Sequence, residues 1–96
     1  MLKESDRKLT PDAKPSISRT HRFQWEEVQN CHVILYPEGM VKLGASAAEI
    51  LKRCDGKNTA RDIIDDLRRH YPGADLEQDV LKFLETAHEN GWIEYQ

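Results

Sequence analysis

The sequence predicts a small α+β domain in which a three-stranded antiparallel sheet is followed by three helices. Two patterns predict this order: short β-branched and aromatic segments in the first half of the chain, and apolar residues at helical spacing in the second half. The length of 96 residues, with 39% hydrophobic and 32% charged residues, fits one domain with a single modest core. We therefore expect one folded domain over residues 21–96, preceded by an arm over residues 1–20.

The arm is rich in charged residues, proline and serine, and Leu2, Leu9 and Ile17 are among its few large apolar residues. Such a segment buries too little apolar surface to offset the entropy that is lost when a chain becomes ordered. We therefore expect the arm to be flexible.

Three strands are expected between residues 21 and 43. Aromatic and polar side chains alternate over residues 21–26, as in a half-buried strand, and residues 31–36 are apolar and β-branched. A turn of proline, glutamate and glycine at residues 37–39 then leads into a third strand over residues 40–43. Consecutive strands joined by short turns indicate an antiparallel meander.

Three capping signals mark where the helices are expected to begin. Ser46 is followed three residues later by Glu49, which is the pattern of a capping box. Thr59 caps a second helix, with Asp62 near its positive end. Asp75, followed by a glutamine three residues on, marks the third helix.

The expected helix ends are marked by glycine or proline. The first helix is expected to stop at Asp55-Gly56, the second to run to His70, and the third to run to about Glu89 before Gly91. The apolar positions of each helix follow the spacing of one buried face. Residues 92–95 are aromatic and β-branched, so they are expected to form a last short strand or a packed strap.

The sequence gives no sign of an enzyme, of a cofactor or of a metal site. No serine, cysteine or lysine is placed beside an oriented base, and the glycines are dispersed rather than gathered into a phosphate-binding loop. The histidines and cysteines lack metal-ligand spacing, and neighbouring residues of a strand point to opposite faces. They are His21, Cys31, His32, Cys54, His70 and His88.

Composition also predicts the compartment. No apolar run approaches the roughly 20 residues that span a bilayer, and the first residues lack the apolar core of a secretory signal. The two cysteines lack the density of a disulfide scaffold, so both are expected to be reduced thiols. We therefore expect a cytoplasmic protein without a membrane interaction.

A small sheet with three short helices is also the composition of a winged helix-turn-helix, which serves DNA binding and protein binding alike. The expected third helix, however, carries five acidic residues against the single base Lys82, and the net charge of the chain is −3. Negative charge repels the phosphate backbone, so nucleic acid is not an expected partner.

The third strand of a small meander instead has an unpaired edge, to which an extended peptide can add as a further strand. Lys42 is expected to meet solvent or a partner there, and Val41→Pro is expected to block the pairing.

Several motifs together carry a resemblance to a known family. They are Phe23–Glu26, His32–Leu43, Ser46–Leu51, Cys54–Gly56, Tyr71–Asp75, Asp79-Val80 and Gly91–Ile93. Their co-occurrence is specific, although each piece alone is not. Over residues 21–95 the chain resembles the pyrroloquinoline quinone (PQQ) biosynthesis protein D family (PqqD).

The resemblance implies a peptide chaperone, a recognition element for ribosomally made and post-translationally modified peptides (RiPPs). Members of the family bind the precursor peptide PqqA and present it to the radical S-adenosylmethionine enzyme PqqE. The resemblance places the peptide beside the third strand and against the third helix. The implied peptide-binding residues are Met40, Val41, Lys42 and Leu43 on the strand, and Leu76, Val80, Phe83 and Leu84 on the helix.

Two other readings remain at this point: a winged-helix DNA-binding regulator, and a purely structural subunit of the radical enzyme. We expect a monomer in solution, although an unpaired strand edge also permits strand-paired or swapped dimers.

Overall fold

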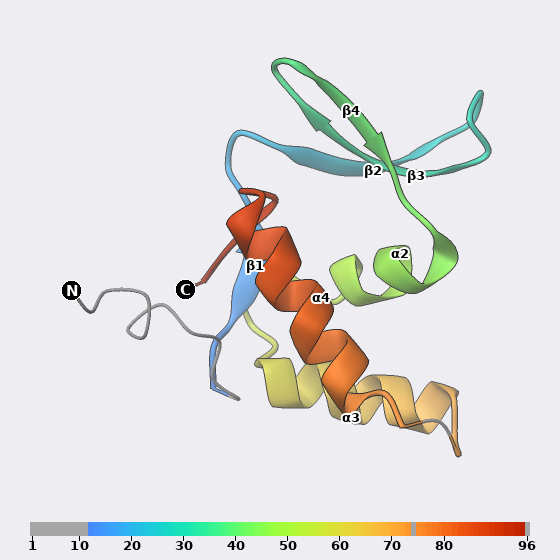
Figure 1. Ribbon diagram of the computed structural model, residues 1–96, viewed down its shortest axis with the longest axis vertical. Helices are drawn as coiled ribbons and strands as arrows, with labels where there is room; N and C mark the ends of the chain where they lie inside the picture. The colour runs from blue at the N-terminus through green and yellow to red at the C-terminus, as the bar shows by residue number, and fades with distance from the viewer. Residues whose placement is uncertain (1–11, 74, 96) are drawn as a thin grey trace.

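The computed structural model describes residues 12–73 and 75–95, and it has the predicted α+β architecture (Figure 1). Figure 1 shows the three-stranded sheet at one end of the molecule, with the helices on one side of it. The strands are β1 (Pro15–Ile17), β2 (Arg22–Glu26), β3 (Cys31–Tyr36), β4 (Gly39–Lys42) and β5 (Ile93–Tyr95). The helices are α2 (Ala45–Leu51), α3 (Ala60–His70) and α4 (Glu77–Glu89).

The predicted meander is confirmed as an antiparallel sheet in the order β2-β3-β4. The second strand has the predicted bounds, whereas the third begins and ends one residue earlier than predicted. In the register of the sheet, Ile34 lies opposite Phe23 on one side and Val41 on the other. Because cross-strand partners share a face, these three side chains lie on the face that packs on the core.

A second sheet of two strands joins the two ends of the described chain. Strand β1 pairs with β5 in antiparallel fashion, from Pro15 opposite Tyr95 to Ile17 opposite Ile93. The prediction of a strand after residue 92 is confirmed, but the predicted arm is wrong for residues 15–17, which form β1. Residues 1–11 of that arm lie outside the described residues.

The segment before and within β1 is also held by the loop before α3 and by the first residue of that helix. The Pro15 carbonyl accepts from the N–H of Gly56, and the Ala13 carbonyl accepts from the N–H of Ala60, both at 2.9 Å. This short polar segment can therefore be ordered, because main-chain groups that are distant in the sequence form hydrogen bonds with its own main-chain groups.

The predicted capping box at the start of α3 is confirmed. Thr59 accepts from the N–H of Asp62, and the Asp62 carboxylate accepts from the N–H of Thr59, each at 3.0 Å. The box predicted at Ser46 is wrong, because α2 begins directly after the sheet with Gly44 as its extended N-cap. The Gly44 carbonyl accepts the first bond of this helix, and the Ser46 side chain makes no cap bond.

The predicted cap at Asp75 is wrong as well, since Leu76 is the N-cap of α4 and no side chain caps that end. Helix α2 ends at Leu51, before the predicted stop, and the chain turns through to Gly56 at a φ of 79°. Gly91, also at 79°, follows the end of α4 as predicted.

One core joins the inner face of the sheet to all three helices. Among its completely buried residues are Ile34 from β3, Ile63 from α3 and Leu84 from α4. Cys54 lies in the same core, where burial raises the pKa of its thiol to about 12. No helix within the described residues is long and apolar enough to cross a membrane.

Candidate functional site

Strand β4 forms one edge of the three-stranded sheet. The N–H of Leu43 donates to the carbonyl of His32 at 3.0 Å, and this bond fixes which main-chain groups of β4 face β3. Because the direction alternates along a strand, the groups of Val41 face β3, whereas those of Met40 and Lys42 face the other way. The edge of β4 therefore presents two N–H and two C=O groups in the spacing that an added strand requires.

The side chains of β4 alternate in the same way. Met40 and Lys42 are exposed on the outer face, as expected for Lys42. Val41 is half-buried against the core on the inner face, and Leu43 is buried in the core. Leu43 is therefore in place to support the strand rather than to meet a ligand.

The four residues implied for the helical wall divide into two pairs. Val80 and Leu84 are buried in the core, with exposed fractions of 2% and 0%. Leu76 and Phe83 are half-buried and pack against that core from its edge. Of the four, Leu76 and Phe83 are the ones that expose substantial side-chain surface.

An apolar pocket opens where α2, the end of α3 and the start of α4 meet. Its volume is about 390 Å³, and its walls are mainly aliphatic. The lining residues are Ala45, Ser46, Glu49, Ile50, Leu67, Tyr71, Leu76, Asp79 and Val80. Of these, only Leu76 and Val80 are among the implied site residues, because periodicity does not reveal which helix ends meet.

The charged residues at this pocket differ in how far they are neutralised. Arg53 lies 3.0 Å from the Glu49 carboxylate and 2.6 Å from that of Asp66, so it ties α2 to α3. Its hydrogen bonds lower the pKa of both carboxyl groups, with Lys52 assisting at Glu49. Asp79, in contrast, is exposed and forms no ion pair with any residue of the described part of the chain.

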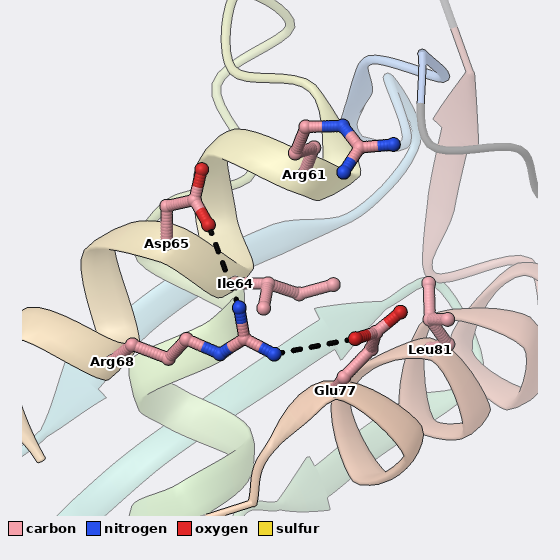
Figure 2. A pocket seen from close by; sticks show the side chains of 6 residues that line it. All are labelled: Arg61, Ile64, Asp65, Arg68, Glu77 and Leu81. Atoms are coloured by element: carbon pink, nitrogen blue, oxygen red, sulfur yellow. Dashed lines mark hydrogen bonds and ion pairs between the residues drawn. The ribbon is translucent and has the colours of Figure 1, made fainter. Parts of the chain in front are cut away.

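A second concavity lies between α3 and α4 and is shown in Figure 2. Its volume is about 40 Å³, and Arg68 reaches across it to Glu77 at 3.2 Å and to Asp65 at 3.9 Å. Figure 2 shows these three side chains pointing toward one another, whereas Arg61 points away. Since its central cation is already paired and the space is small, this concavity joins two helices rather than holding a ligand.

The histidines, which lack metal-ligand spacing in the sequence, are spread over the fold. His21 stacks on Tyr36, His32 on Phe23, and His88 on Tyr95. Within residues 12–73 and 75–95, no group of three or more histidine, cysteine, aspartate or glutamate residues is placed to hold a metal ion.

Comparisons with known proteins agree with this architecture. The family described as "Coenzyme PQQ synthesis protein D (PqqD)" matches residues 31–93. The PqqA binding protein of Azotobacter vinelandii is 56% identical over 81 residues, which cover 83% of this chain and 88% of that protein. The PqqA binding protein of Methylococcus capsulatus is 48% identical over 85 residues, which cover 88% of this chain and 91% of that protein.

A solved structure is similar over nearly the same range. It is the solution NMR structure of the PqqD truncation of Methylobacterium extorquens PqqCD, described as a functional and stand-alone RiPP recognition element. The TM-score is 0.73 at 31% identity, and the match covers 90% of this chain and 94% of that one. The chain therefore belongs to the PqqD family of coenzyme PQQ synthesis proteins.

Proposed function

We propose that this chain binds the precursor peptide PqqA as an additional strand along β4 and presents it to the radical S-adenosylmethionine enzyme PqqE. The observation that carries the proposal is the β4 edge, where main-chain groups of Met40 and Lys42 face away from the sheet. The relatives named PqqA binding proteins support the identity of the peptide.

The alternation of β4 determines how such a peptide would lie. A peptide residue opposite Val41 turns its side chain toward the inner face, where Val41 and Phe83 border the core. The residues before and after it turn outward, beside Met40 and Lys42. Main-chain bonds would then fix the register, and every second side chain would supply selectivity.

The sheet has two edge strands, β2 and β4, and the proposal selects β4 for a physical reason. The chain passes from β4 directly into α2, whose first residues line the apolar pocket. A peptide on β4 therefore has apolar surface beside its path, and apolar burial provides affinity that main-chain bonds alone do not. The resemblance to the family implies the same strand.

We further propose that the chain is not itself an enzyme. Its contribution is to order a flexible peptide, while the chemistry belongs to the radical enzyme. A peptide that this chain already holds has lost part of its conformational entropy before it meets PqqE. The entropic cost of binding to the enzyme is therefore lower. A cytoplasmic location and a monomeric state belong to the same proposal.

The charges of the helices disfavour the rival reading of nucleic-acid binding. In α4, Glu77, Asp79, Glu85 and Glu89 are exposed beside the single base Lys82. In α3, Arg68 is paired with Asp65 and Glu77, and Arg69 is paired with Asp66, which leaves Arg61 as the arginine of this helix without an ion pair among the described residues. Bases that are mostly paired in α3 and outnumbered in α4 offer little to a phosphate backbone.

The test is isothermal titration of the purified chain with synthetic PqqA in physiological salt. The proposal expects saturable one-to-one binding. No binding of free peptide, together with binding to purified PqqE, would replace the proposal with that of a structural subunit. Salt-sensitive retention of duplex DNA in a gel, without binding of PqqA, would replace it with that of a regulator.

A further inference from the structure

We propose that the apolar pocket between α2, α3 and α4 receives one large apolar side chain of the bound peptide, at a residue adjacent to a lysine or arginine. This residue would lie beyond the segment that pairs with β4. The inference rests on the proposed function, because it assigns a second contact to the same peptide.

The walls of the pocket suit an apolar side chain. Ile50, Leu67, Leu76 and Val80 supply its aliphatic floor, and Tyr71, which is 48% exposed, stands at its rim. The volume of about 390 Å³ is many times the roughly 30 Å³ that a water molecule occupies in the liquid. Water against such walls is released favourably when an apolar group replaces it.

The pocket lies within reach of the β4 edge. Ala45 on its wall is three positions after Lys42, so the two Cα atoms are at most about 10 to 11 Å apart along an extended chain. Of the two residues between β4 and α2, Leu43 is buried in the core, whereas Gly44 is exposed, and a Cβ built on Gly44 would meet no atom within 4 Å. A peptide that leaves β4 at this end therefore finds an open path to the pocket after about three residues.

The unpaired carboxylate at the rim of the pocket favours a particular type of residue next to the buried side chain of the peptide. Asp79 lines the pocket, is exposed, and forms no ion pair with another described residue. Glu49 on the opposite wall is already bonded to Lys52 and Arg53. Asp79 is therefore the carboxylate available to a lysine or arginine of the peptide, and such an exposed pair adds selectivity more than affinity.

The experiment titrates the wild-type chain and its variants with synthetic PqqA and with a set of PqqA peptides in which each apolar residue in turn is replaced by alanine. Ala45→Leu places a larger side chain on the wall of the pocket. Lys82→Leu is its control, because it adds an exposed leucine to α4 at a position that does not line this pocket. Asp79→Asn removes the free carboxylate, and Glu85→Gln is its matched control on α4.

Ala45→Leu is expected to weaken binding of PqqA by about tenfold or more, because a buried apolar side chain loses its place. One of the alanine-substituted peptides should bind the wild-type chain more weakly than PqqA does, by a similar factor. For that peptide, Ala45→Leu should cause little further loss of affinity. Asp79→Asn is expected to weaken binding about two- to fivefold at 50 mM NaCl, and this effect should vanish at 0.5 M NaCl. Both controls should stay within about twofold of the wild type.

The outcomes separate this inference from the proposed function. If wild-type chain binds PqqA but Ala45→Leu binds it within twofold, the pocket assignment is overturned and the function stands. If wild-type chain does not bind PqqA at all, both are overturned. If Ala45→Leu does not fold, as judged by its ¹H–¹⁵N spectrum, isotope-filtered NOEs on the wild-type complex decide. Contacts between one peptide side chain and the methyl groups of Ile50, Leu76 and Val80 support the pocket, and their absence overturns it.

Discussion

Lys42→Pro removes one main-chain donor from the β4 edge while it leaves the bonds between β3 and β4 intact. The N–H of Lys42 faces away from β3, and proline is tolerated on an edge strand where its missing N–H faces outward. The same change at Val41 would act on the other side, because the groups of Val41 face β3. Val41→Pro, the substitution that the sequence suggested, therefore perturbs the sheet itself.

The size of the effect follows from the groups at the edge. Met40 and Lys42 together offer four main-chain groups, so a fully paired strand gains roughly 2 to 6 kcal/mol at 0.5 to 1.5 kcal/mol for each bond. Lys42→Pro removes one bond and leaves a peptide carbonyl without its donor, which costs about 1.5 to 3 kcal/mol together. This corresponds to a loss of affinity of about ten- to one-hundred-and-fifty-fold.

The assay is titration with PqqA beside urea unfolding of each variant. Lys42→Val keeps the N–H but removes the ammonium group, and its affinity is expected to stay within about fivefold of wild type. Val41→Pro is expected to lower the free energy of unfolding by about 1 to 3 kcal/mol, since it leaves a buried acceptor on β3 unpaired. If Lys42→Pro binds PqqA as tightly as Lys42→Val does, the assignment of the β4 edge is refuted.

Three further predictions concern the stability of the fold. Thr59→Ala removes the capping side chain of α3 and is expected to lower the free energy of unfolding by about 0.5 to 2 kcal/mol in urea, so an unchanged midpoint and slope would contradict the cap. Arg53 lowers the pKa of Glu49 and Asp66 in the folded state, so the stability that it contributes is present above their ordinary values of 4.5 and 3.8 and is lost as the pH falls through the lowered values. Urea unfolding between pH 7 and pH 2.5 should therefore show a steeper loss of stability in the wild type than in Arg53→Gln, and parallel curves would argue against the network. The Cys54 thiol, with a pKa of about 12, should resist iodoacetamide at pH 8 until urea unfolds the chain, and mass spectrometry after each step would detect early labelling.

Local patterns predicted those elements whose stabilising interactions lie within a few residues. The bounds of β3 follow from its continuous apolar run, and the start of α3 follows from Thr59 and Asp62, three residues apart. Ser46 and Glu49 show the same spacing and yet form no box. There the strand before α2 brings Gly44 into the capping position, so the tertiary path of the chain decides against the local signal.

Elements that depend on distant partners were not predictable in this way. Pro15–Ile17 is short and lies in a polar segment, and its pairing with β5 comes from the other end of the described chain. The apolar pocket likewise joins residues of three helices, of which the family resemblance implied only Leu76 and Val80. Periodicity identifies which face of a helix is apolar, but the packing angles decide where two such faces leave a space between them.

The pairing of β1 with β5 also determines how the domain would respond to mechanical force. Pro15 lies opposite Tyr95, so the outward ends of both strands are at the same end of this short ladder. Tension applied through any partner attached at those ends would open the ladder one bond after another, as a zipper opens, rather than shear all its bonds at once. Such peeling would release Pro15 from Gly56 and Ala13 from Ala60, and the sheet β2-β3-β4, with the edge proposed to hold the peptide, would bear the load only after this ladder has opened.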